Sequence, residues 1–264
     1  MDIDFFQATV LGIIQGLTEF LPISSSAHLL LPSLVFGSGD LGLSFDIAVH
    51  AGTLMAVIYF FKSEIILMAK SVFTTEENFS QHRKLTLYLI IATIPIIFAG
   101  LTFSSLIEQR IFSISNIAYI NLFFAGILLF AFMYRKENKG IFEITIYGAL
   151  IIGIIQCFAI IPGASRSGMA ITAALLIGMN LKDASKFAFM LGIPTILGAL
   201  VFLIIDSQIS GTTYNFLNLV IGFFVSMFFA FFTIKFFLNF VERIGMVPFV
   251  IYRIILGLFL LLIV

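Results

Sequence analysis

Two charged residues, Glu19 and Arg166, each lie within a long apolar stretch of the sequence. Glu19 belongs to LGIIQGLTEFLPISSSAHLL (residues 11–30), and Arg166 belongs to IIGIIQCFAIIPGASRSGMAITAALLIG (residues 151–178). A charge at the centre of a bilayer costs at least about 2.5–3.5 kcal/mol on insertion scales, so such a residue usually faces a polar cavity and has a function. The two residues therefore indicate a site at membrane depth.

Both stretches follow the same plan. In each one, a glutamine in an apolar helix is followed six or seven residues later by a proline, then by a serine-rich break and a second apolar helix; the pairs are Gln15–Pro22 and Gln156–Pro162. Matched broken segments in the two halves of a membrane protein point to its binding site. We predict that the two breaks meet near the membrane midplane.

The first break carries a carboxylate beside an amide. Gln15 and Glu19 are four residues apart, so their side chains lie on one helical face near a helix C-terminus. Two oxygen-bearing groups at the negative end of a helix suit a hard cation. The alternative is that Glu19 only forms hydrogen bonds to neighbouring helices.

Serines and a histidine follow in the same break. One of Ser24, Ser25 and Ser26 is expected to cap the next helix, and the free N–H groups of that helix N-terminus suit an anion. His28 comes three residues after Ser25, so both could face one cavity, where a neutral imidazole would act as a general acid or base. The alternative for His28 is a hydrogen bond between helices.

The second break, PGASRSG (162–168), has the residue types of an oxyanion site. Its glycines allow close backbone approach, its serines donate hydrogen bonds, and the arginine fork matches a phosphate. The phosphate-binding residues predicted here are Gly163, Ser165, Arg166, Ser167 and Gly168, with Ser24 and Ser26 from the first break. A structural ion pair between Arg166 and Glu19 would explain the charges but not the glycines and hydroxyls.

Three further polar residues are candidates for an outer shell of the site. Asp46 and His50 are four residues apart on one helical face; they are either partners of the site or interfacial caps. Gln156 mirrors Gln15, but Ile160 stands where a carboxylate would be expected. The two repeats have therefore diverged, the first toward catalysis and the second toward anion binding.

The composition is that of a polytopic membrane protein. Of the 264 residues, 61% are hydrophobic and 11% charged, and the mean hydropathy is +1.15. The formal net charge is zero, so nucleic acid is not an expected partner. Cys157 is the one cysteine, which excludes an internal disulfide, and we expect it to be a packing residue.

Basic residues predict the topology, because Lys and Arg mark cytoplasmic loops. They gather at 62–84, 135–139, 182–186 and 235–253. With all four clusters inside, the full transmembrane helices are 45–61, 85–104, 114–134, 187–205, 216–234 and 247–264. Arg110 and Asp206 then lie in external turns.

The two segments with breaks must each return to the side from which they start. Two short full spans are the alternative for 139–182, but a re-entrant helix pair keeps its break at membrane depth, where irregular backbone is tolerated if it lines a cavity. Residues 3–36 form the other pair. The predicted fold is an all-α polytopic membrane protein in one membrane domain (1–264), an inverted-topology repeat of halves about 1–136 and 141–264, with six full transmembrane helices and two re-entrant helix pairs.

The motifs resemble those of the undecaprenyl-diphosphate phosphatase family of bacitracin-resistance membrane proteins. QGLTEFLPISSSAH (15–28) and PGASRSG (162–168) are similar to its two signatures. The resemblance implies removal of the terminal phosphate from undecaprenyl diphosphate, with Mg²⁺ or Ca²⁺, at catalytic residues Glu19, Ser25, His28 and Arg166. Gln15 and Glu19 are then the metal ligands. Many members have glutamate at the position of Gln15, so the neutral amide departs from a two-carboxylate site.

The resemblance also predicts the setting of the reaction. The expected partners are a polyprenyl diphosphate lipid and membrane lipids, and a homodimer is allowed. The expected location is the bacterial plasma membrane, with a site open to the periplasmic side. The nucleophile is either Ser25, activated by His28, or a water molecule activated by Glu19 or His28. A lipid-carrier flippase or secondary transporter is the first alternative, and a structural membrane subunit, which would leave both charges unexplained, is the second.

Overall fold

The fold is all-helical, as predicted. The computed structural model describes residues 2–37, 41–103, 113–210 and 215–263; apart from an isolated bridge between Lys139 and Met179, the regular elements in these ranges are helices. The predicted external Arg110 lies outside the described residues, and the side chain of Asp206 is not described.

Four helices are long and apolar enough to cross a membrane: α5 (Ser80–Thr102), α7 (Ile114–Met133), α10 (Leu181–Ser210) and α11 (Phe216–Ile244). A fifth span is possible where α3 (Gly42–Phe60) continues into α4 (Lys62–Phe73) after a bend of 77°. The helix predicted at 247–264 is present as α12 (Val247–Leu262), whose 16 residues make a shorter apolar helix. The chain therefore has the architecture of a multi-pass membrane protein.

Both glutamine-containing segments are interrupted where the sequence predicts. α1 (Asp2–Thr18) and α2 (Ser25–Phe36) flank the first break, while α8 (Ile146–Gln156), the short 3₁₀ helix η3 (Cys157–Ile160) and α9 (Arg166–Leu176) flank the second. The residue before a proline is disfavoured in the helical conformation. Ile161, which precedes Pro162, accordingly has an extended backbone (φ −83°, ψ 120°).

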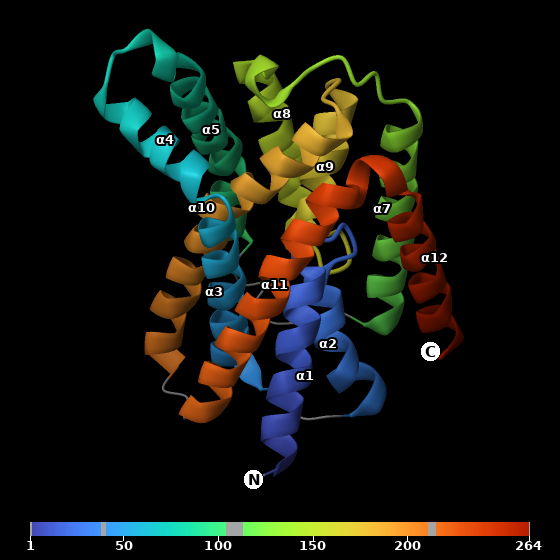
Figure 1. Ribbon diagram of the computed structural model, residues 1–264. Coiled ribbons are helices and arrows are strands. Elements are labelled where there is room, and N and C mark those ends of the chain that lie inside the picture. The colour runs from blue at the N-terminus through green and yellow to red at the C-terminus, as the bar shows by residue number, and fades with distance from the viewer. Residues whose placement is uncertain (1, 38–40, 104–112, 211–214, 264) are drawn as a thin grey trace.

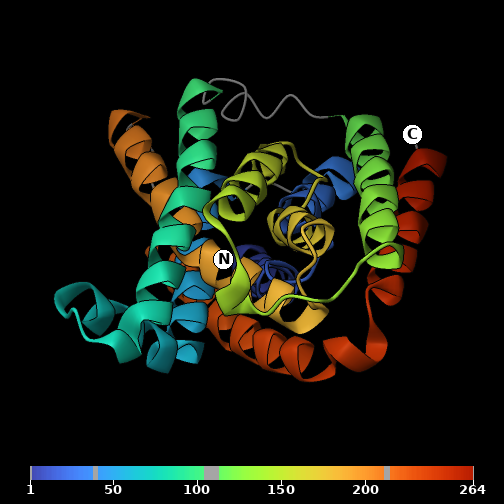
Figure 2. The same ribbon diagram turned by 90° about the horizontal axis from the view of Figure 1, so that it is seen from above.

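The two broken segments enter the molecule from opposite ends. Figure 1 shows α1 rising from the N-terminus to mid-height and α2 running back, whereas α8 and α9 lie in the opposite half. Seen from above in Figure 2, α8 and α9 lie near the middle, with α5, α7, α10, α11 and α12 around them. The breaks are thus enclosed by the longer helices.

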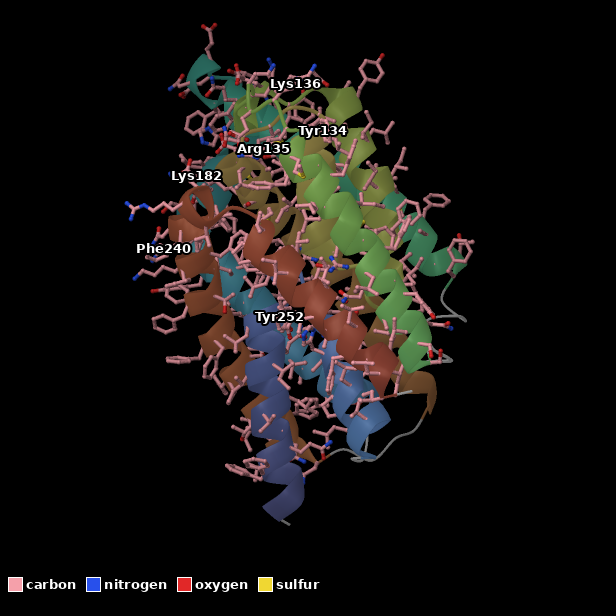
Figure 3. All side chains as sticks on the ribbon, turned by 90° about the vertical axis from the view of Figure 1, so that its right-hand side faces the viewer. Tyr134, Arg135, Lys136, Lys182, Phe240 and Tyr252 are labelled. Atoms are coloured by element: carbon pink, nitrogen blue, oxygen red, sulfur yellow. The ribbon has the colours of Figure 1, made fainter. Side chains whose placement is uncertain are left out.

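Basic side chains gather at one end of the structure. Figure 3 shows Arg135, Lys136 and Lys182 toward the upper end, where Lys182 forms an ion pair with Glu242 at 3.2 Å.

Arg253 contradicts the prediction that grouped it with the cytoplasmic cluster 235–253. It lies within α12 and is 0% exposed, because its guanidinium finds hydrogen-bond acceptors inside the protein.

Helices α1 and α3 both pack along α11. Glycines in α1 and α3 allow this close packing. A Cβ added at Gly52 would overlap both the Phe223 carbonyl oxygen and Ser226 Oγ, and one at Gly16 would lie 2.6 Å from the Ser226 carbonyl oxygen. Small residues let helix backbones approach in membranes, where apolar surface supplies little driving force between helices.

We predict that Gly52→Ala lowers stability by about 1–3 kcal/mol, because the methyl group overpacks the α3–α11 contact. Gly126→Ala is the matched control: no atom lies within 4 Å of a Cβ at this exposed helical position. Thermal unfolding in detergent should show a lower Tm for the first variant and an equal or higher Tm for the second. Equal Tm values for both variants would contradict the packing role of Gly52.

Candidate functional site

The two breaks touch each other directly. The Gly163 backbone N–H donates to Ser24 Oγ at 3.1 Å, and Ser167 Oγ donates to the Leu21 carbonyl oxygen at 2.9 Å. Each break thus supplies hydrogen-bond partners to polar groups of the other. Apolar surroundings could not supply these partners. The meeting of the breaks expected from the sequence is present in the structure.

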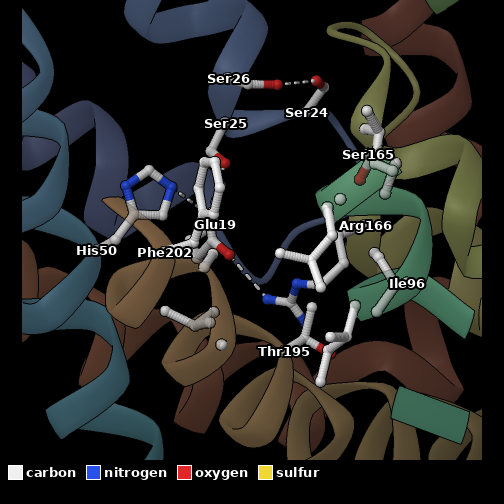
Figure 4. Close-up of a pocket in the computed structure, with 18 residues that line it drawn as sticks. Glu19, Ser24, Ser25, Ser26, His50, Ile96, Ser165, Arg166, Thr195 and Phe202 are labelled. Carbon is white, nitrogen blue, oxygen red and sulfur yellow. Dashed lines mark hydrogen bonds and ion pairs between the residues drawn. The ribbon is translucent and has the colours of Figure 1, made fainter. Parts of the chain in front are cut away.

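Glu19 is the centre of the polar contacts at this junction. It is only 7% exposed; its Oε1 accepts from Arg166 Nη2 at 2.8 Å and its Oε2 from Ser25 Oγ at 2.6 Å (Figure 4). His50 Nε2 lies 3.8 Å from Glu19 Oε2. The carboxylate of the first break therefore neutralises the guanidinium of the second.

Arg166 is seated against α10. Its Nη1 donates to the Ala188 carbonyl oxygen at 3.2 Å, and a Cβ at Gly192 would lie 2.5 Å from the same nitrogen. Gly192 therefore leaves the space that the guanidinium occupies. No sequence signal marks this glycine, because it lies in an ordinary apolar helix.

Gln15 contacts Glu19 through its amide nitrogen. Nε2 donates to Glu19 Oε2 at 3.0 Å, while Gln15 Oε1 is buried and has no hydrogen-bond partner among the described residues. Gln156 is fully buried too, and neither polar atom of its amide is paired in the described part of the chain. Only the glutamine of the first break therefore lies against the carboxylate.

A cavity of about 290 Å³ opens at the junction. Its polar side is formed by Glu19, Ser24, Ser25, Ser26, His50, Ser165 and Arg166. Its other side is apolar and comes mainly from α5 and α10, including Ile97, Ile196 and Phe202. Figure 4 shows His50, Glu19 and Arg166 pointing toward this space from different elements. The cavity suits a ligand with a charged head and an apolar tail.

His28 and His50 are placed differently from one another. His28 is not among the cavity-lining residues: its Nδ1 lies 2.7 Å from the Ser24 carbonyl oxygen and its Nε2 2.6 Å from Tyr252 Oη. Its ring also stacks on that of Tyr252. His50 lines the cavity, and its Nδ1 lies 2.7 Å from the carbonyl oxygen of Asp46, so Asp46 contacts His50 through its backbone.

Most serines and glycines of the second break stabilise or permit its backbone conformation. Ser165 caps α9 by accepting from the Gly168 N–H at 3.1 Å, and it has a positive φ of 75°. Gly163 has φ +100°, and a Cβ there would lie 2.9 Å from the Ile117 carbonyl oxygen. Ser165 lines the cavity, whereas Ser167 is fully buried. Of the phosphate-binding residues predicted in this break, Ser165 and Arg166 thus face the cavity.

Two residues of α12 reach the junction but were not predicted to do so. Tyr252 contacts His28, and Arg253 donates to backbone oxygens of both breaks. Arg253 stands in an apolar segment, as Arg166 does, so the same sequence signal could have identified it. Its grouping with the basic cluster 235–253 pointed instead to the cytoplasmic end of the helix 247–264.

Comparisons with known proteins agree with these features. A family model described as bacitracin resistance protein BacA matches residues 8–259. Similar curated proteins, each called undecaprenyl-diphosphatase, come from Alcanivorax borkumensis (43% identity over 260 residues, 98% of each chain), Saccharophagus degradans (43% over 257 residues, 96% of each) and Teredinibacter turnerae (43% over 259 residues, 97% of this chain and 98% of the relative).

We predict that Glu19 and Arg166 stabilise the fold as a pair. Removing one partner of a buried pair leaves an uncompensated charge and costs about 3–5 kcal/mol, whereas replacing both is often neutral. Glu19→Gln and Arg166→Met should each lower the Tm in detergent, and the double variant should recover most of the loss. Additive losses in the double variant would contradict the pairing.

Proposed function

Because the chain belongs to the BacA family of bacitracin resistance proteins, we propose that it hydrolyses undecaprenyl diphosphate to undecaprenyl phosphate and inorganic phosphate. The product is the lipid carrier of peptidoglycan synthesis, and its recycling would give resistance to bacitracin. One observation carries this proposal. Glu19 and Ser25 from one break and Arg166 from the other face a single cavity that is polar on one side and apolar on the other.

The polar side would bind the diphosphate. Arg166 offers a planar fork that matches two phosphate oxygens, and Ser24, Ser25 and Ser26 add hydroxyl groups. α2 and α9 both begin at the cavity, and helix N-termini favour anions. In the structure Arg166 is paired with Glu19, so a bound phosphate would share or replace that contact and leave Glu19 free to accept a proton.

Glu19 is the proposed general base. Ser25 Oγ donates to Glu19 Oε2 at 2.6 Å, which is the contact required for proton transfer. In the serine route, Ser25 Oγ attacks the terminal phosphorus, its proton passes to Glu19, and undecaprenyl phosphate leaves. Water then attacks the phosphoserine, the bond from phosphorus to Ser25 Oγ breaks, Ser25 regains the proton from Glu19, and phosphate is released. In the water route, Glu19 takes the proton from a water molecule that attacks the same phosphorus, and Ser25 donates to the phosphate.

A divalent cation, Mg²⁺ or Ca²⁺, would be held by Glu19 and Gln15. The residues present fit this role once the Gln15 amide is turned over: here Nε2 donates to Glu19 Oε2, and Oε1 is a buried oxygen without a partner among the described residues. No group of three His, Cys, Asp or Glu side chains gathers in the described ranges, so other ligands would come from water and the diphosphate. When bound, the cation neutralises charge on phosphate oxygens.

The apolar side of the cavity would hold the first isoprene units of the substrate. Ile97, Leu101 and Phe202 line it, and a Cβ added at Gly100 of α5 would have no atom within 4 Å. α5 and α10 expose many other apolar side chains, as expected for helices in contact with lipid. The tail of the lipid could therefore continue from the cavity toward the bilayer between hydrophobic surfaces.

The proposed topology is an inverted repeat in the plasma membrane, within one membrane domain. α1–α2 and α8–α9 are the re-entrant pairs, and α3, α5, α7, α10, α11 and α12 are the six full spans. Opposite directions of the two broken segments support this arrangement (Figure 1), as do basic residues at one end (Figure 3). That end would be cytoplasmic, with the site open to the periplasm. A homodimer stays a prediction.

Phosphate release from undecaprenyl diphosphate by the purified protein in detergent tests the proposed function. The wild-type protein should release phosphate, and Arg166→Lys should lose at least about 10-fold in kcat/KM because an ammonium lacks the two-point fork. A flippase or transporter would release none, so absence of phosphate from well-folded wild-type protein would refute the phosphatase. Near-normal turnover by Arg166→Ala would refute only the phosphate-clamp role of Arg166.

A cation titration of the same reaction tests the metal ligands. We expect chelator to abolish activity reversibly and Glu19→Gln to behave like chelation. Gln15→Glu should lower the cation concentration required, because it adds a charged oxygen ligand one helical turn from Glu19. Full activity of Glu19→Gln at ordinary Mg²⁺ would remove Glu19 from the metal site.

Labelling of single cysteines tests the sidedness, on a Cys157→Ser background. Asn138 and Asn215 are both exposed and lie near opposite ends of the chain's long helices. A membrane-impermeant reagent added outside intact cells should label Asn215→Cys and spare Asn138→Cys. The reverse pattern would invert the proposed topology.

A further inference from the structure

Arg253 joins the two breaks from the side of α12. Its side chain is 0% exposed. Nη1 donates to the carbonyl oxygens of Pro22 and Ala164, each at 3.3 Å, and Nη2 donates to the Gly163 carbonyl oxygen at 2.7 Å. One guanidinium therefore bridges backbone groups of the first break and the second.

The guanidinium is itself held in orientation by α7. Arg253 Nε donates to Asn121 Oδ1 at 2.8 Å, and Asn121 Nδ2 donates back to the Arg253 carbonyl oxygen at 2.6 Å. Four of the five N–H groups that an arginine carries are thus engaged. Hydrogen bonds at Nε and at both terminal nitrogens fix the orientation of the guanidinium, which therefore holds the two breaks at a fixed distance.

The charge of Arg253 has no acidic partner in the part of the chain that the structure describes. The ion pair of Arg166 with Glu19 is the contrasting case at the same junction. Taking a charge out of water costs several kcal/mol, and backbone carbonyls offset that cost only in part. A buried arginine without an acidic partner is therefore a costly packing residue. We take its role to be the hydrogen bonds that it donates to the backbone carbonyl groups.

These contacts set the direction of the backbone at the second break. No described peptide bond is cis, and in a trans peptide the C=O and the following N–H point in opposite directions. Because the Ala164 carbonyl points at Arg253, the Ser165 N–H points away from α12. Ser165 and Arg166 line the cavity, whereas Arg253 does not. Arg253 thus acts on the cavity only through the backbone that it holds.

A neighbouring residue of α12 acts on the first break in the same way. Tyr252 Oη contacts His28 Nε2 at 2.6 Å, and His28 Nδ1 contacts the Ser24 carbonyl oxygen at 2.7 Å. α12 thus reaches the backbone of the first break twice, through Arg253 at the Pro22 carbonyl and through His28 at the Ser24 carbonyl. Ser24 itself has a positive φ of 72°, a conformation that needs such support in a residue other than glycine.

We propose that Arg253 is a positioning residue for the reaction: it fixes the two breaks against each other so that Glu19 and Ser25 of one break face Arg166 of the other. This inference rests on the proposed phosphatase function. A misplacement of about 1 Å can lower a rate about 10²-fold. Loss of Arg253 should therefore lower kcat beyond what any loss of folded protein accounts for, with little change in substrate binding.

Kinetics of Arg253→Met and Arg253→Lys provide the test, with Arg243→Met as the matched control at an exposed arginine near the end of α11. We expect Arg253→Met to lose about 10–100-fold in kcat with KM changed less than about 3-fold, and Arg253→Lys to recover part of the loss. Arg243→Met should match the wild-type protein. Tm values in detergent are measured for every variant.

A double-mutant cycle separates positioning from general stability. If Arg253 acts by aligning Arg166 with Glu19, then the losses of kcat/KM from Arg253→Met and Arg166→Lys should be strongly non-additive. Normal kcat in Arg253→Met, or losses that are additive and follow the fraction of folded protein, would overturn the proposal. All comparisons are made relative to wild-type activity, so an inactive wild-type protein would refute the phosphatase function instead.

Asn121→Ala provides a second route if Arg253→Met does not fold. It keeps the buried charge and frees only the base of the fork. We expect a smaller loss of kcat, about 3–10-fold, in the same direction and with KM again little changed. A folded Asn121→Ala with unchanged kcat, together with a folded Arg253→Lys of unchanged kcat, would overturn the positioning role.

Discussion

The structure depends on the contact between two interrupted helices inside an apolar protein. An interrupted helix leaves backbone N–H and C=O groups without partners, and neither lipid nor apolar side chains can supply them. Here the breaks supply one another: the Gly163 N–H bonds to Ser24 and the Leu21 carbonyl to Ser167. Arg253 takes three further carbonyl groups. Each break is tolerated only because the other lies against it.

The same contact creates the chemistry of the site. A carboxylate from the first break and a guanidinium from the second become neighbours, and each lowers the cost of burying the other. A diphosphate carries negative charge that can compete with Glu19 for Arg166. Substrate binding would then release a carboxylate that already contacts the Ser25 hydroxyl, so in the proposed mechanism one ion pair would link substrate binding to the general base. The apolar walls of α5 and α10 line the same cavity, so both parts of an amphipathic substrate would be accommodated at once.

The sequence by itself determined the helical class, the positions of the breaks and the meeting of Glu19 and Arg166 at one site, whereas their direct ion pair was decided by the tertiary structure. These follow from local chemistry, since proline next to serine and glycine interrupts a helix and a charge within an apolar segment requires a partner. The two motifs also indicated the family, which the BacA match across nearly the whole chain confirms. Other features needed the tertiary structure. α3 bends sharply into α4, and His50 rather than His28 lines the cavity, because Tyr252 of α12 holds the His28 ring elsewhere.

Arg253 is the clearest example of a residue whose surroundings are determined by the tertiary structure. Its grouping with the basic cluster 235–253 predicts the cytoplasmic end of the helix 247–264, yet the folded chain presents it with backbone carbonyls from segments about 90 and 230 residues away. Gln15 is a second case, because only the position of Glu19 decides that its amide N–H, and not its oxygen, faces the carboxylate. A side chain's type is written in the sequence, but its hydrogen-bond partners are set by whichever distant segments the fold brings within about 3 Å.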